Sequence, residues 1–177
     1  RSDPALKFIV LSLAFYGLAT FEGPMLAIKS VNVFSHFTEW TIGHVHSGAL
    51  GWNALITFGT FYFLVPRLAG APLYSARLAN IHFWLALAGI MLYVLSMWGA
   101  GVSQGVLWLS LDELGEVRFS FNDVMAAMKP YYLLRFVGGF LFLAGAVLMA
   151  FNLARTFAGR RTVTVAPPPA HAARGLA

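Results

Sequence analysis

The sequence predicts an all-α membrane protein, and two observations carry that prediction. The 177 residues are 59% hydrophobic and only 11% charged, unlike the composition of a water-soluble domain. The apolar residues also gather into four runs, each near the ~20 residues that cross a bilayer as a helix. We therefore expect about four transmembrane spans. The absence of cysteine excludes disulfides, cysteine-ligated iron–sulfur clusters and a thioether-bound haem within this chain.

The first two spans are expected at residues 5–21 and 41–65. A glycine-proline pair at 23–24 follows the first run and is expected to end its helix. Residues 25–39 alternate polar and apolar side chains without forming a full span. We expect this connection to lie at the membrane surface or to fold over a cofactor.

The third and fourth spans are expected at residues 78–102 and 131–154, and Pro130 is expected to open the last one. The loop before the third span, residues 67–77, carries only positive charges. The connection between these two spans, residues 103–129, is longer and contains most of the acidic side chains. It is expected to lie outside the membrane.

These runs predict a transmembrane region at residues 1–158 and a disordered tail at residues 159–177, which is rich in alanine and proline. Basic residues before the first span, in the loop after the second and in the tail all fall on one side. The positive-inside rule then places both termini in the cytoplasm. The net charge of +5 does not indicate nucleic-acid binding, because the basic residues form no single patch.

Two histidines, His44 and His46, lie near the start of the second span. Imidazoles inside a membrane helix are costly unless they have partners, so they are expected to be functional. At about 100° of rotation per residue, side chains two positions apart leave opposite faces of an α-helix. We therefore expect these histidines to ligate two different centres rather than to share one metal ion.

Two glycines, Gly48 and Gly51, follow His44 at i+4 and i+7, on the same face of an α-helix. A face without side chains lets a flat, bulky group lie against the backbone. Haem is such a group, and histidine is a common ligand of its iron. The competing interpretation is that both histidines are core residues packed between helices rich in small residues. The spacing favours haem ligation.

Several stretches carry a family resemblance. The longest runs from Trp40 to Trp52 (WTIGHVHSGALGW), and shorter ones lie at residues 22–25, 28–32, 35–36 and 79–84. Together they resemble the catalytic subunit of cbb(3)-type cytochrome c oxidases, the C-type branch of the haem–copper oxidase superfamily. The resemblance covers residues 5–155, nearly the whole chain. That subunit has about twelve membrane helices, so this four-span chain is similar to its C-terminal third.

The resemblance implies roles for three histidines. His44 is implied as the proximal ligand of a high-spin b-type haem, where oxygen binds, and His46 as an axial ligand of a low-spin haem b. His36 is implied to lie near the haem propionates, although it also fits a surface histidine at a helix cap. The complete subunit contains copper, whose ligands lie upstream of this region, so no residue here is assigned to copper.

Three other ionisable residues stand out. Glu22 ends an apolar run and is the candidate for proton transfer, against the competing interpretation of an interface residue exposed to water. His82 is expected to make a hydrogen bond at a helix end. Arg135, one turn into its span, is expected to extend toward the membrane surface.

The implied function is a part of the catalytic core of a proton-pumping terminal oxidase, which reduces O2 to water with electrons from c-type cytochromes. The implied partners are the remaining helices of the subunit, mono-haem and di-haem c-type cytochrome subunits, lipid and O2, in a bacterial inner membrane. One alternative is a nitric oxide reductase-like subunit, a relative with a similar His-x-His helix and non-haem iron. Another is a non-catalytic membrane b-type cytochrome. Residues 46–52 favour the oxidase.

Overall fold

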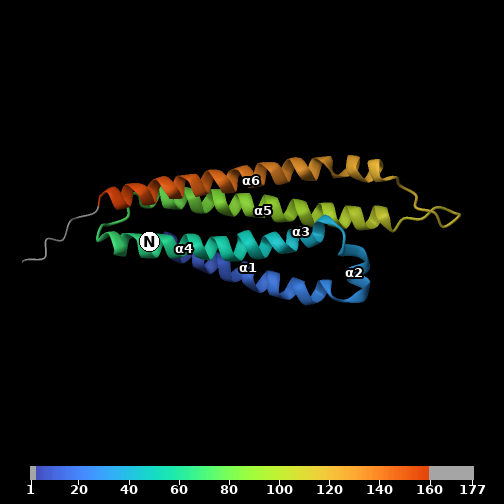
Figure 1. The fold of residues 1–177 in the computed structure, drawn as a ribbon, viewed down its shortest axis with the longest axis horizontal. Coiled ribbons are helices and arrows are strands. Elements are labelled where there is room, and N and C mark those ends of the chain that lie inside the picture. The colour runs from blue at the N-terminus through green and yellow to red at the C-terminus, as the bar shows by residue number, and fades with distance from the viewer. Residues whose placement is uncertain (1–2, 160–177) are drawn as a thin grey trace, which may run out of the picture.

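The computed structural model describes residues 3–159, and this part of the chain folds into long helices that lie side by side (Figure 1). Four helical stretches are long and apolar enough to cross a membrane, which confirms the predicted all-α membrane fold. They are α1 (Pro4–Leu26), a continuous helix made of α3 (Glu39–His46), η1 (Ser47–Ala54) and α4 (Leu55–Ala69), α5 (Ala76–Trp108) and α6 (Phe121–Ala158). The predicted disordered tail, from residue 160 onward, lies outside the described residues.

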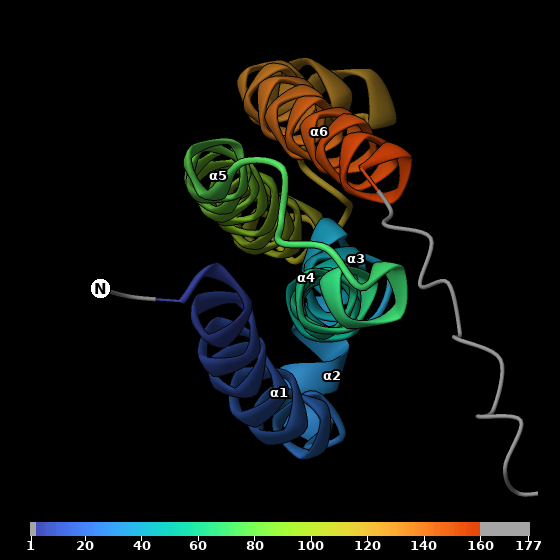
Figure 2. The ribbon, with the colours of Figure 1, turned by 90° about the vertical axis from the view of Figure 1, so that its left-hand side faces the viewer.

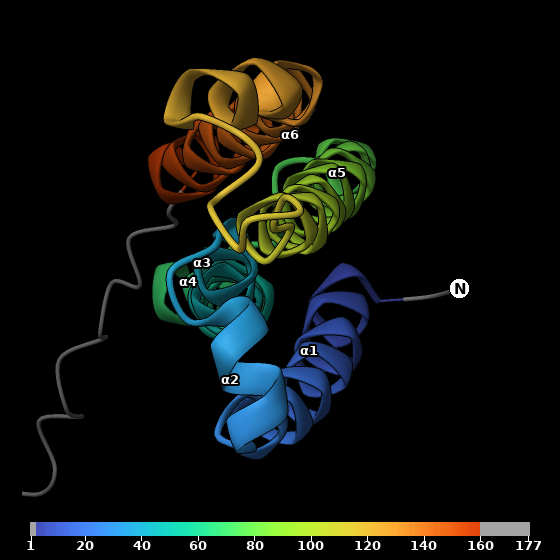
Figure 3. The ribbon, with the colours of Figure 1, turned by 90° about the vertical axis from the view of Figure 1, so that its right-hand side faces the viewer.

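Successive spans run in alternating directions. The start of α1, the connection between α4 and α5, and the end of α6 lie at one end of the bundle (Figures 1 and 2). The opposite end carries the α5–α6 connection and the short helix α2 (Lys29–Ser35), which bridges α1 and α3 (Figure 3). We call this opposite end the α2 end. Within the bundle α5 packs mainly on α6 and α3, and α1 packs mainly on α4.

Short polar side chains start the long helices by accepting hydrogen bonds from free backbone N–H groups. Asp3 caps α1, and Ser75 caps α5 by accepting from the N–H of Leu78 at 3.2 Å. At the start of α6, Ser120 and Asp123 form a reciprocal capping box. These caps set the helix starts independently of the membrane-spanning apolar runs.

Two prolines do not act as expected. Pro24 lies inside α1, which continues to Leu26, and Pro130 lies well inside α6, which begins at Phe121. Proline cannot donate a hydrogen bond to the carbonyl four residues earlier, but α1 ends only two residues after Pro24, so the loss affects only its last turn. Pro130 does not open its helix because the capping box has already started α6 upstream.

The connection expected outside the membrane at residues 103–129 is mostly helical, because α5 and α6 extend beyond the apolar runs. Only residues 109–120 remain non-helical. They form a turn held by an isolated antiparallel bridge between Leu111 and Val117.

Close approach between helices depends on glycine at two places. A Cβ atom at Gly101 of α5 would overlap the backbone of Trp40, so α3 and α5 touch at this level. Gly89 of α5 and Gly138 of α6 face each other, and a Cβ atom on Gly89 would lie 2.7 Å from the carbonyl oxygen of Gly138. Small residues that bring backbones together are the usual basis of helix packing in membranes.

Candidate functional site

The helix α3 directs His44 and His46 toward different neighbours. His44 faces α1, where its Nδ1 lies 3.4 Å from Oε2 of Glu22. His46 faces α5, where its ring centroid lies 5.0 Å from that of Tyr93. The two imidazoles therefore face different helices on either side of α3, in agreement with their two-residue spacing.

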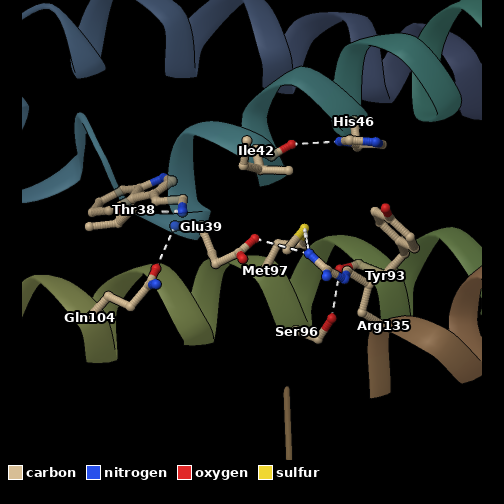
Figure 4. Close-up of polar contacts among 10 residues, drawn as sticks. Thr38, Glu39, Ile42, His46, Tyr93, Ser96, Met97, Gln104 and Arg135 are labelled. Atoms are coloured by element: carbon tan, nitrogen blue, oxygen red, sulfur yellow. Dashed lines mark hydrogen bonds and ion pairs between the residues drawn. The ribbon is translucent and has the colours of Figure 1, made fainter. Parts of the chain in front are cut away.

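The hydrogen bond of His46 assigns its tautomer. Its Nδ1 lies 2.8 Å from the carbonyl oxygen of Ile42, one turn back along α3 (Figure 4). A carbonyl oxygen can only accept, so Nδ1 carries the hydrogen and donates it. The Nε2 atom then keeps its lone pair, which is the form of imidazole that binds a metal.

The same reasoning applies to His44, with a stronger acceptor. Glu22 is only 3% exposed, and its other oxygen, Oε1, accepts a 2.7 Å hydrogen bond from the indole N–H of Trp40. Its Oε2 accepts from Nδ1 of His44 through a longer contact of 3.4 Å. A histidine that donates Nδ1–H to a carboxylate presents a free Nε2, the arrangement common among metal-ligating histidines.

Glu22 is thus buried rather than exposed to water at an interface, and its shown contacts are with His44 and Trp40. Its role in proton transfer stays a prediction. The sequence did not predict this pairing with His44, because the two residues lie on different helices and 22 positions apart.

A groove of about 410 Å³ lies beside His44 between α1 and the α3–η1 helix. Its lining residues are Ala19, Thr20, His44, Val45, Gly48, Ala49, Trp52 and Asn53. At Gly48 an added Cβ atom would meet nothing closer than the Cβ of Ala19, at 3.9 Å, so this part of the helix is open. The groove gives a flat group a place next to the imidazole of His44.

The predicted glycine strip is open only at its first position. A Cβ atom at Gly51 would overlap the ring of Phe15 on α1. Gly51 faces α1, as His44 and Gly48 do, so the three residues share one face as predicted, but Phe15 fills the space beside Gly51. An eight-residue π-helix, η1, begins directly after His46. π-helical segments are frequent at functional sites.

A second groove, of about 420 Å³, lies on the α5–α6 side and includes Tyr93 in its lining. The other lining residues are Tyr132, Arg135, Phe136, Gly139, Phe140 and Leu143. Arg135 donates to Oε2 of Glu39 at 3.1 Å, which links α6 to α3 near His46 (Figure 4). Sequence reasoning missed this ion pair, although an arginine within a span signals that a partner is needed.

The other two histidines in the described residues are not brought to these sites. His36 is exposed at the turn between α2 and α3, where its Nδ1 lies 3.4 Å from the amide of Asn32. Its role at the propionates stays a prediction. His82 belongs to α5 and is fully buried near the end of the bundle opposite the α2 end. Its Nδ1 lies 3.0 Å from the hydroxyl of Tyr62. It is a core residue in the second turn of α5, and its hydrogen bond to Tyr62 agrees with the expectation of a hydrogen bonder near a helix end.

This geometry fits two haem groups. Both His44 and His46 have Nδ1 engaged with an acceptor. His44 itself lines the groove on the α1 side, and His46 lies beside Tyr93, which lines the groove on the α5–α6 side. The histidines point to separate neighbours, so one metal ion shared between them does not fit. A flat group ligated through Nε2 on each side does.

Comparisons with known proteins point to a haem protein of this kind. The family model described as cytochrome c and quinol oxidase polypeptide I matches residues 1–141. Cytochrome c oxidase subunit 1 of Rhodobacter capsulatus is 54% identical over 159 residues, which are 89% of this chain and 30% of that protein. The cbb3-type cytochrome c oxidase subunit CcoN1 of Stutzerimonas stutzeri is 51% identical over 157 residues, 88% of this chain and 33% of that protein.

A more distant relative is a nitric oxide reductase of Stutzerimonas stutzeri, 31% identical over 163 residues, 89% of this chain and 33% of that protein. The chain thus spans about a third of the length of the curated relatives it matches. With four helices that can cross a membrane and these bacterial relatives, it is a bacterial membrane protein.

Proposed function

The chain belongs to the cytochrome c and quinol oxidase polypeptide I family of the haem–copper oxidase superfamily, and we propose that it forms the C-terminal part of the catalytic core of a cbb(3)-type terminal oxidase. The complete protein would reduce O2 to water with electrons from c-type cytochromes and pump protons. The observation that carries the proposal is the helix with two histidines, each with Nδ1 engaged with an acceptor and each facing a different neighbouring helix.

In this proposal His44 holds a high-spin b-type haem in the groove beside α1, and His46 holds a low-spin haem b on the side of α5. The haems supply the redox-active iron. The chain's own residues hold and orient the two imidazoles: Glu22 keeps the hydrogen of His44 on Nδ1, and the Ile42 carbonyl does the same for His46.

The short backbone segment between the two ligands also fixes the relation of the two centres. Only Val45 separates His44 from His46 in the chain. Since both belong to the same turn of α3, the distance and the orientation between the two ligated groups are set by the helix itself. Such a fixed spacing suits repeated electron transfer from the low-spin to the high-spin centre.

We further propose that the chain works together with the remaining helices of its subunit, which would provide copper and its ligands, and with mono-haem and di-haem c-type cytochrome subunits. It would lie in a bacterial inner membrane with both termini in the cytoplasm. The α2 end of the bundle would then face the periplasm. Glu22 is kept as a proton-transfer candidate and His36 as a propionate contact.

A nitric oxide reductase is the less favoured function, because that relative is clearly less similar to this chain than the cytochrome c oxidases are. A non-catalytic membrane b-type cytochrome is also less favoured. It needs a second axial ligand for each haem, and among residues 3–159 His36 and His82 lie away from both grooves.

The test is a pair of difference spectra on the assembled complex, reduced minus oxidised and with carbon monoxide. His44→Ala should remove the carbon monoxide signal, because the gas binds the high-spin iron, and His46→Ala should mainly remove the low-spin α-band. His82→Ala is a control within the same helix bundle, and it should retain both signals if the complex assembles. If both haem signals survive in both ligand variants, the assignment fails.

A further inference from the structure

We propose that Tyr93 fixes the plane of the His46 imidazole and thereby sets the orientation of this axial ligand on the low-spin haem. The proposal rests on the proposed function, because it takes His46 to be a haem ligand. It assigns to Tyr93 a positioning role: the tyrosine acts on the imidazole ring.

Two contacts from different directions hold the imidazole of His46. The carbonyl of Ile42 accepts from Nδ1 at 2.8 Å and holds one edge of the ring. The ring of Tyr93 lies across from it, with its centroid 5.0 Å away and its plane tilted by 38° (Figure 4). A hydrogen bond alone lets an imidazole rock about the bonded atom. An aromatic ring packed beside it restricts that motion.

Hydrogen bonds and close packing connect the helices that carry His46 and Tyr93. The backbone N–H of Glu39 donates to Oε1 of Gln104 on α5 at 2.7 Å, and its carboxylate accepts from Arg135 on α6 at 3.1 Å. A Cβ atom at Gly101 would overlap the backbone of Trp40, so α3 and α5 lie in direct contact. These links place the α3 turn that contains His46 at a fixed distance from Tyr93.

The contact between Tyr93 and His46 is one of ring against ring, and the described residues include no hydrogen bond from the Tyr93 hydroxyl to His46. The described geometry is an aromatic pair, and replacing the tyrosine by phenylalanine keeps it. An aliphatic side chain fills volume but offers no flat surface against the imidazole. Because the orientation of an axial imidazole governs the splitting of the iron d orbitals, losing the flat surface should appear in the spectrum of the ferric low-spin haem. Neighbouring groups that orient metal-ligating histidines commonly tune the metal in this way.

The test compares electron paramagnetic resonance spectra of the oxidised, assembled complex for Tyr93→Leu and Tyr93→Phe. We expect Tyr93→Leu to shift or broaden the largest g-value of the low-spin haem while haem content stays near that of the parent. Tyr93→Phe should give the parent signal. Tyr131→Leu is the matched control: Tyr131 lies on the same α5–α6 interface but packs on Gly99 and lies 3.0 Å from the Ser103 hydroxyl.

An unchanged low-spin signal in Tyr93→Leu would overturn the proposal, as would a Tyr93→Phe signal that changes as the leucine signal does. An equal shift in Tyr131→Leu would also overturn it, because the effect would then come from general repacking. If Tyr93→Leu does not assemble, Tyr93→Met takes its place with the same two outcomes. His46→Ala separates this proposal from the proposed function: if that variant retains the low-spin signal, ligation by His46 itself is wrong.

Discussion

The surroundings of His44 and His46 differ, although the two histidines share one turn of helix. Nδ1 of His44 meets the buried carboxylate of Glu22, which a tryptophan N–H also holds. Nδ1 of His46 meets a neutral backbone carbonyl and its ring lies beside an aromatic residue. A negative acceptor makes an imidazole a stronger electron donor than a neutral one does. One helix therefore presents two imidazoles in chemically different surroundings, with a carboxylate from α1 beside His44 and an aromatic ring from α5 beside His46.

The largest effect should come from removing the carboxylate on the His44 side. We expect Glu22→Ala to lower the affinity of the high-spin haem by about 10-fold to 100-fold, the usual cost of losing such a hydrogen-bond partner. The low-spin haem should stay. The haem content per complex and the amount of carbon monoxide bound per complex measure the loss of the high-spin haem and the retention of the low-spin haem.

Glu39→Ala is the matched control, since it removes a carboxylate that lies near the same end of the bundle but pairs with Arg135 of α6 instead of His44. Its carbon monoxide signal should equal that of the parent. Equal losses in the two variants would mean that the two sides do not differ as described.

The two glycines of η1 lie in different surroundings: Gly48 lines the groove beside His44, and Gly51 packs against Phe15. Gly51→Ala should destabilise the protein by about 1–3 kcal/mol, because its methyl group would overlap Phe15 and force repacking. A lower midpoint of thermal unfolding of the complex would show this.

Gly48→Ala is expected to act differently. Its methyl group fits beside Ala19 at 3.9 Å, so the thermal midpoint should stay within error of the parent. The same methyl group projects into the groove beside His44, so the carbon monoxide spectrum should change. A Gly48→Ala protein with lowered stability and an unchanged spectrum would contradict the position of the groove.

The smallest effect is expected for the ion pair near His46. Arg135 and Glu39 are about 32% and 14% exposed in their side chains, so solvent screens part of their attraction. After that allowance Glu39→Gln should cost no more than about 1 kcal/mol. Thermal unfolding in low and high salt checks this, with a smaller salt dependence in the variant. A loss of several kcal/mol would show that the pair matters far more to the fold than its exposure indicates.

The sequence was sufficient for the fold class and for the family. Apolar runs predicted all four spans, and the stretch around His44 and His46 carried a resemblance that the family comparison confirms. It was less informative about helix ends. Pro24 and Pro130 each favour a helix boundary locally, but helix caps and tertiary packing override that preference and both prolines lie inside helices.

The environment of each histidine was harder to predict for a physical reason. The Glu22–His44 and Glu39–Arg135 contacts join helices that are distant in the chain, and helix periodicity says nothing about such pairs. The π-helix η1 was also missed, because periodicity arguments assume α-helical winding. The ring of Phe15, which fills the space beside Gly51, was missed because it comes from another helix. Charged residues inside spans were the usable signal, since each needs a partner.

The most direct test of the difference between the two sides is a redox titration that resolves both haems in the parent and in Glu22→Gln. A carboxylate stabilises the more positive ferric state, so its replacement by a neutral amide should raise the potential of the high-spin haem. If that carboxylate contributes ~1.4 kcal/mol, the rise is about 60 mV. The low-spin potential should stay unchanged. An unchanged high-spin potential, or an equal shift of both, would contradict the account.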